Sequence, residues 1–221
     1  MTPRRHVVIT GTGRAGTTFL VELLTHLGLE TGFGVESAGR KMNTLGRAGL
    51  EHDIRHAKCP YIVKSPWFCE YAEDVLDRED IIVEHIFLPI RDLYAAAESR
   101  RWVSNTGLSS LSFLGLVRHM LRPKHWLKPK EFPGGLWHTR SSEPEAQEHV
   151  LLMQLYRLLL AASNYEVPIT LLRYPRLTKD SEYLFAKLAP VLQNIDSNSF
   201  REVFQRVVRP ELVHRFGDKD C

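Results

Sequence analysis

The segment TGTGRAGTT at residues 10–18 combines residue types that bind phosphate. Its glycines let the backbone approach an anion closely, Arg14 adds a positive charge, and Thr17 and Thr18 add hydroxyl donors. A short apolar run at residues 6–10 precedes the segment, and an apolar stretch with helical spacing follows it and ends before Gly28. A strand, a glycine loop and a helix in this order direct backbone N–H groups at an anion. The predicted phosphate-binding residues are Gly13, Arg14, Ala15, Gly16, Thr17 and Thr18.

Other interpretations of this loop stay open. The nucleotide triphosphatase pattern GxxxxGK[ST] requires lysine at position 17, where this chain has Thr17, and the nearest cation is Arg14. The spacing of Gly11, Gly13 and Gly16 also approaches GxGxxG, but no acidic residue clearly closes a second strand about 20 residues later, as a dinucleotide site requires. A glycine turn without a ligand is a further alternative.

The elements that must position this loop follow from hydrophobic periodicity. Apolar β-type runs at residues 61–64, 81–90 and 167–173 predict further strands. Helical spacing predicts helices at residues 93–102, with Asp92 as its cap, and at 145–164, 179–193 and 199–208. Strands that alternate with helices predict a mostly parallel central sheet covered on both faces, an α/β three-layer sandwich of the P-loop NTPase-like type. We expect a single domain over residues 1–221, with an irregular lid or insert around residues 104–144.

Composition excludes several classes of protein. The 221 residues are 43% hydrophobic and 25% charged, which is typical of a globular protein, and the net charge of +3 does not require nucleic acid as a partner. Cys59, Cys69 and Cys221 form neither a CxxC pair nor a zinc-binding pattern. The chain has no apolar run long enough for a signal peptide or a membrane span. We expect a cytoplasmic monomer or homodimer without a metal, without nucleic acid and without membrane insertion.

Two motifs together resemble a known family. The sequence RAGTTFL from Arg14 is similar to the 5′-phosphosulfate loop PRSGTTLL of sulfotransferases that use 3′-phosphoadenosine-5′-phosphosulfate (PAPS), with Ala15 in place of serine. Arg91, at the end of FLPIR, and Ser99 have the spacing of the arginine and serine that hold the 3′-phosphate in that family. The resemblance implies that Arg91 and Ser99 bind the 3′-phosphate of PAPS. If this motif is taken alone, the alternative is that Arg91 pairs with a carboxylate and that Ser99 is an exposed serine on a helix.

A third segment, LRYPRLTKD at residues 172–180, resembles the family's stretch in which a tyrosine lies near the adenine. This implies Tyr174 as an adenine neighbour, although Pro175 and Arg176 replace the usual acidic pair. The resemblance covers approximately residues 6–36, 61–66, 84–102 and 167–192.

Sulfuryl transfer requires stabilisation of the leaving oxygen and a base for the acceptor proton. The resemblance implies that Lys64 in VKSP stabilises the leaving phosphate and that Arg14 holds the phosphosulfate. Pro66 stands where small-molecule members of the family carry a catalytic histidine, so Glu36, placed like the glutamate base of other members, is the predicted base. Glu30 is its closest competitor.

The expected activity is transfer of a sulfuryl group from PAPS to a hydroxyl of a glycan, small molecule or peptide, with 3′-phosphoadenosine-5′-phosphate (PAP) as the product. A P-loop-type kinase of a small metabolite or nucleoside is one alternative, and it requires Mg²⁺ and a lysine that the loop lacks. A catalytically inactive nucleotide-binding protein is the other.

Overall fold

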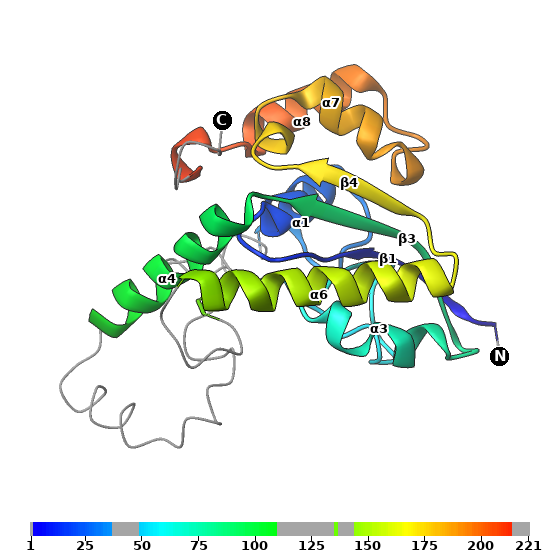
Figure 1. The fold of residues 1–221 in the computed structure, drawn as a ribbon. Helices are drawn as coiled ribbons and strands as arrows, with labels where there is room; N and C mark the ends of the chain where they lie inside the picture. Colours follow the sequence, from blue (N-terminus) through cyan, green and yellow to red (C-terminus); the bar gives the residue numbers. More distant parts are fainter. Residues whose placement is uncertain (1, 37–48, 110–134, 137–143, 214–221) are drawn as a thin grey trace.

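A computed structural model describes residues 2–36, 49–109, 135–136 and 144–213 (Figure 1). Its central sheet contains four parallel strands in the order β2-β1-β3-β4. The strands are β1 (Arg4–Ile9), β2 (Ile62–Lys64), β3 (Ile81–Ile90) and β4 (Ile169–Arg173). These runs are rich in β-branched residues, which pack well on a pleated surface.

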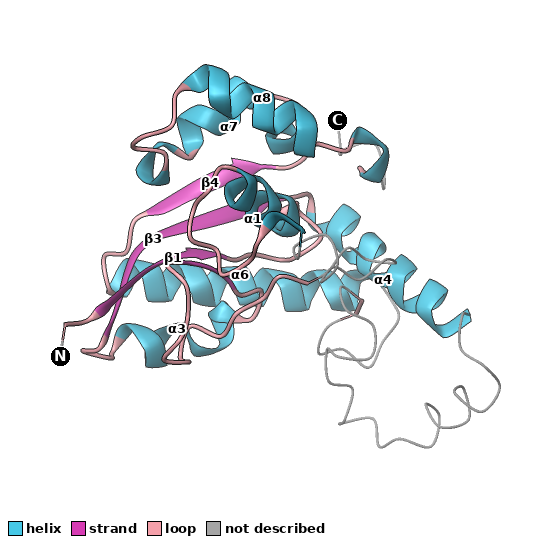
Figure 2. Ribbon diagram, turned by 180° about the vertical axis from the view of Figure 1, so that it is seen from behind, coloured by secondary structure: helices cyan, strands magenta, loops and turns pink. Residues whose placement is uncertain are grey.

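Helices cover both faces of the sheet. Helices α1 (Thr17–His26), α7 (Ser181–Lys187) and α8 (Ser197–Val207) lie on one face, and α3 (Phe68–Leu76) and α6 (Pro144–Asn164) lie on the other (Figures 1 and 2). Helix α4 (Leu93–Ser109) leaves the carboxyl end of β3 and packs against α6. Single 3₁₀ turns occupy Arg176–Thr178, Ala189–Val191 and Pro210–Leu212. The predicted α/β three-layer architecture with a parallel sheet is therefore confirmed.

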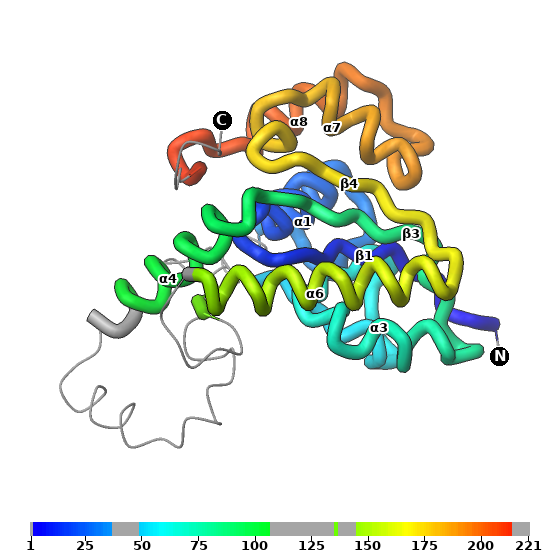
Figure 3. Tube along the Cα trace, in the orientation of Figure 1, coloured from blue at the N-terminus to red at the C-terminus, as the bar shows by residue number. Residues whose placement is uncertain are grey.

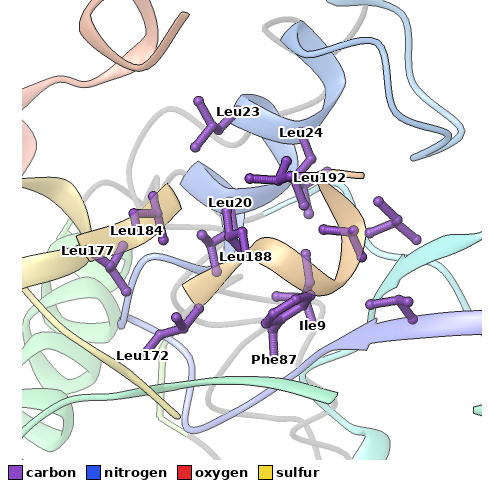
Figure 4. Close-up of a cluster of buried hydrophobic side chains, with 14 of the residues drawn as sticks. Ile9, Leu20, Leu23, Leu24, Phe87, Leu172, Leu177, Leu184, Leu188 and Leu192 are labelled. Atoms are coloured by element: carbon purple, nitrogen blue, oxygen red, sulfur yellow. The ribbon is translucent and has the colours of Figure 1, made fainter. Parts of the chain in front are cut away.

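Alternating side chains of the strands supply two hydrophobic cores. Val7 and Ile9 of β1 join the core beneath α1, α7 and α8, and Figure 4 shows Ile9 and Phe87 of the sheet among leucines of α1, of β4 and of residues 177–192. Val8, between them, points to the opposite face and packs in the core of α3 and α6. This two-residue period fixes the register of β1, since a shift by one residue would exchange the two faces.

The connections of two neighbouring strands leave the sheet in opposite directions. Helix α1 joins β1 to β2 on one face, whereas α4 and α6 join β3 to β4 on the other (Figure 3). In open α/β sheets such a reversal at the carboxyl ends of adjacent strands is the usual place of a ligand site. Both the loop after β1 and the start of α4 lie at this edge.

The structure differs from the sequence prediction in three elements. Helix α4 continues past Trp102 to Ser109, so residues 104–109 of the predicted irregular insert are helical. The buried side chain of Ser104 accepts a hydrogen bond of 2.9 Å from Leu136 N–H, a tertiary contact that local periodicity does not reveal. Helix α3 was missed, and the predicted helix at 179–193 divides into α7 and a 3₁₀ turn. The remainder of the insert, apart from residues 135–136 and Pro144 at the start of α6, lies outside the described residues.

One predicted feature, the cap of α4, is confirmed at this level. The carboxylate of Asp92 accepts a hydrogen bond of 3.0 Å from Ala95 N–H and so caps α4. In the part of the chain that the structure describes, no helix is both long and apolar enough to cross a bilayer.

Candidate functional site

The loop between β1 and α1 adopts a conformation that requires glycine. Gly13 and Gly16 have φ values of +66° and +87°, in the left-handed region, and Arg14 between them has φ of +56°. A Cβ atom on Gly13 would lie 2.5 Å from Nη2 of Arg100, and one on Gly16 would lie 2.9 Å from Cδ1 of Leu177. The glycines therefore serve both the backbone turn and its close packing against α4 and the segment after β4.

Helix α1 begins at this loop in a form suited to an anion. Its N-cap residue, Gly16, contributes no side-chain cap, and the first turn contains no acidic residue. Two threonines, Thr17 and Thr18, open the helix, and Thr17 is buried. The positive end of the helix dipole and hydroxyl donors thus meet at one point.

Arg14 connects this loop to α4. Its Nε atom donates a hydrogen bond of 3.0 Å to Oγ of Ser99, and Nη1 of Arg91 donates one of 3.1 Å to the carbonyl oxygen of Arg14. Ser99 and Arg91 are both buried, with exposed fractions of 1% and 4%. The two motifs that the sequence assigns to separate phosphates are therefore joined by direct contacts. The guanidinium carbon of Arg91 also lies 4.9 Å from the ring centre of Tyr174, which brings the predicted adenine neighbour to the same place.

Lys64 reaches the loop from the end of β2. Its ammonium group is buried and donates to Oγ1 of Thr18 at 2.8 Å, to the carbonyl oxygen of Gly49 at 2.6 Å and to Oε1 of Glu51 at 3.0 Å. Burial, together with the positive charge of Arg14, lowers the pKa of Lys64, and the charge of Glu51 opposes this shift. The predicted leaving-group lysine thus contacts the first turn of α1.

A further cation, Arg100, supports the loop from α4. Its buried guanidinium donates from Nε to the carbonyl oxygen of Thr12 at 3.1 Å and from Nη1 to that of Gly135 at 2.7 Å. Burial and the charge of Arg14 lower the pKa of Arg100 to about 9. Burial and the charge of Arg91 likewise lower the pKa of Arg14 to about 10. The fold therefore holds like charges close together, and an anion among them would relieve this repulsion.

The structure does not bring Glu36 into this cluster. Glu36 is exposed, and no hydrogen bond or ion pair within the described ranges connects it to Arg14, Lys64 or Arg91. Glu30, its competitor, is also exposed. The assignment of Glu36 as the base stays a prediction.

Sequence reasoning missed two residues of the site, Arg100 and Glu51. A signal for Arg100 was present, because it follows the buried Ala96 and Ala97 at helical spacing and so belongs on the covered face of α4. Glu51 gave no such signal, since it lies in an irregular segment and meets Lys64 only through the tertiary fold.

Among residues of known placement, no group of three or more histidine, cysteine, aspartate or glutamate side chains is arranged to hold a metal ion. A separate hollow lies between α3 and α6, lined by residues such as Glu70, Asp74, Arg157 and Leu160, and none of the predicted site residues lines it.

Comparisons of the chain with protein-family models, curated proteins and solved structures found no match.

Proposed function

We propose that this protein is a sulfotransferase that transfers the sulfuryl group of PAPS to an acceptor hydroxyl. The observation that carries the proposal is the pair of contacts between the loop after β1 and the segment that runs from the end of β3 into α4, from Arg14 to Ser99 and from Arg91 to Arg14. A nucleoside that carries one phosphate at its 5′ position and another at its 3′ position requires two neighbouring anion sites. The contacts hold the loop close to α4, which supports the proposal.

The residues present fit such a donor. The start of α1, with the N–H groups and hydroxyls of Thr17 and Thr18, and the guanidinium of Arg14 would hold the 5′-phosphosulfate. Arg91 and Ser99 would hold the 3′-phosphate. The ring of Tyr174, which is next to Arg91, would lie against the adenine ring of the donor. When bound, PAPS supplies an activated sulfuryl group whose leaving group is a phosphate.

The catalytic contribution of this chain is mainly positioning and charge neutralisation. Lys64 lies against Thr18 at the first turn of α1, where its ammonium would stabilise negative charge on a leaving phosphate. Arg14 adds a second positive charge close to Lys64, since its charge contributes to the lowered pKa of that lysine. Glu36 remains the proposed acceptor of the proton from the substrate hydroxyl.

The kinase alternative has less support. The position of the missing loop lysine is Thr17, and the carboxylate of Asp92, a candidate for a magnesium ligand, caps α4 instead. A nucleotide-binding protein without catalysis would use the same phosphate contacts and would differ only in the absence of transfer.

Calorimetric titration of the purified protein with PAP, in parallel with ATP and Mg²⁺, tests the proposal. We expect micromolar binding of PAP without a metal, far tighter than binding of ATP. A preference for ATP with Mg²⁺ would refute the sulfotransferase assignment. Binding of PAP with no transfer from PAPS to any of a panel of glycan, phenol and peptide hydroxyls would favour the inactive protein.

A further inference from the structure

The contacts of Lys64 raise a question about its availability. An ammonium group has three protons, and in this structure Thr18, Gly49 and Glu51 accept all three. A lysine in this state has no proton left for an oxygen of a bound anion. One of the three contacts must therefore be exchanged when Lys64 binds such an oxygen.

The three acceptors differ in how easily they can be exchanged. The carbonyl of Gly49 belongs to the backbone, and Thr18 lies in the first turn of α1, where the proposed anion would bind. Glu51 is the only charged acceptor of the three, and its side chain is 27% exposed while that of Lys64 is 2% exposed. A carboxylate oxygen also resembles a phosphate or sulfate oxygen in charge and in hydrogen-bonding capacity. Glu51 is thus the acceptor that an incoming anion can replace.

The backbone around Glu51 holds it in this position. Gly49 has φ of +141°, and Leu50 has φ of +62°, a left-handed conformation that is unfavourable for a residue other than glycine. The side chain of Leu50 is buried in the core beneath α1, and Gly49 N–H donates to Oε1 of Glu51 at 3.1 Å. Packing of Leu50 therefore maintains a strained turn that directs both the Gly49 carbonyl and the Glu51 carboxylate at Lys64.

We propose that Glu51 is an internal counter-ion that keeps Lys64 charged and in place until the donor binds, and that a donor oxygen then replaces the Glu51 carboxylate on Lys64. This inference rests on the proposed function for the identity of the donor, but the exchange itself applies to any phosphate or sulfate anion at this site. Glu51 acts through Lys64 and is a positioning residue. Its carboxylate competes with the anion for the same ammonium group.

The proposal predicts opposite effects of one substitution on stability and on binding. In Glu51→Gln the buried ammonium loses its counter-ion, so we expect a lower Tm without ligand. The competing charge is also lost, so we expect PAP and inorganic pyrophosphate to bind about tenfold more tightly. A purely structural role would lower the Tm and leave affinity unchanged or weaker, and that result would overturn the proposal.

Three further variants sharpen this test. Glu51→Asp keeps the charge but shortens its reach, so its anion affinity should fall between those of the wild type and Glu51→Gln, and this variant also serves if Glu51→Gln does not fold. In a Lys64→Met background, Glu51→Gln should no longer raise the affinity. Glu84→Gln is the matched control, because Glu84 forms its ion pair with Arg5, away from the loop, and should leave binding unchanged.

The two probes separate failure of this proposal from failure of the proposed function. If the wild type binds pyrophosphate but not PAP, the sulfotransferase assignment fails, and the effect of Glu51→Gln on pyrophosphate binding still decides the exchange. If neither anion binds to the wild type or to Glu51→Gln, Lys64 exchanges its carboxylate for neither probe, and the proposal is wrong.

Discussion

Arg14 and Ser99 are 85 residues apart in the sequence, and their side chains are joined by a hydrogen bond of 3.0 Å. The bond runs from the glycine loop after β1 to the middle of α4, and the carbonyl of Arg14 is held at the same time by Arg91. The side chain and the backbone carbonyl of Arg14 are thus both held by residues of the second motif, Ser99 and Arg91. Substitutions in the glycine loop and in this second motif can therefore be tested separately.

Removal of Arg91 should affect one phosphate more than the other. We expect Arg91→Ala to weaken PAP binding by roughly 10- to 100-fold, the effect of one or two charge-assisted hydrogen bonds. Binding of adenosine 5′-phosphosulfate, which has no 3′-phosphate, should change much less. Titration calorimetry with both ligands measures the difference, and Arg201→Ala, which removes an exposed arginine paired with Glu182, is the control. An equal loss for both ligands would contradict the assignment of Arg91.

Two glycines allow the effect of packing to be separated from that of backbone conformation. Gly16 and Gly28 have similar φ values of +87° and +80°, but of the two a Cβ atom would collide only at Gly16, because at Gly28 it would have no heavy atom of the described residues within 4 Å beyond its neighbours in the chain. We expect Gly16→Ala to cost roughly 2–3 kcal/mol of unfolding free energy and to abolish PAP binding, and Gly28→Ala to cost roughly 1 kcal/mol and leave binding intact. Urea denaturation and calorimetry test both. Normal PAP affinity in Gly16→Ala would show that the loop does not hold the ligand.

Arg100 should matter for binding although its side chain bonds to the backbone. Its planar guanidinium donates hydrogen bonds to the carbonyl oxygens of Thr12 and Gly135, and the single ammonium group of a lysine cannot reproduce this geometry. We expect Arg100→Lys to lower stability by roughly 2 kcal/mol and PAP affinity by roughly tenfold, because the loop loses support. Thermal unfolding and calorimetry measure the two effects. Unchanged affinity would mean that the loop keeps its shape without this contact.

Asp92 distinguishes the sulfotransferase from the kinase alternative. Because its carboxylate caps α4, we expect Asp92→Ala to lower the unfolding free energy by about 1 kcal/mol and to change PAP affinity little. If Asp92 were a magnesium ligand, the same substitution would abolish metal-dependent ATP binding. Calorimetry with and without Mg²⁺ gives the answer.

The burial of His6 predicts that stability depends on pH, and this effect does not involve the candidate anion site. Burial lowers the pKa of His6 below its ordinary value of 6.5, against the opposing effect of the hydrogen bond to the carbonyl of Pro60. The unfolded chain therefore takes up the proton before the folded protein does, and stability falls as the pH decreases below 6.5. We expect a smaller loss between pH 7.5 and 5.5 in His6→Gln, measured by urea denaturation. An identical loss in wild type and variant would assign the effect to other groups.

Much of the fold was predictable because its elements have strong local signals. Residues 81–90 are mostly apolar, and β3 occupies the whole of this range, within which a strand is predicted. The cap of α4 was predictable because aspartate before an apolar helix has a local cause. By contrast, α3 is short and follows Pro66 and Trp67 without a capping side chain, so its start gave no signal.

The site was predictable to the extent that its residues lie in contiguous motifs. The loop after β1 and the pair Arg91 and Ser99 could be found from spacing, and the structure joins them. The contact between Lys64 and Glu51 depends on a turn whose conformation is imposed by the burial of Leu50, which no local pattern encodes. The site was therefore visible in the sequence as separate parts, and their mutual contacts were not.

The opposite directions in which the chain leaves β1 and β3 have a consequence for folding. Neither the first strand with its loop nor the third strand with α4 contains a complete site, so the site exists only after these two strands have paired. An anion that binds there recognises the native state alone and stabilises it by mass action, by about 2.7 kcal/mol at 100 times Kd. Ligand-dependent unfolding would thus report on the pairing of β1 with β3, and a fragment that ends before β3 should show no such stabilisation.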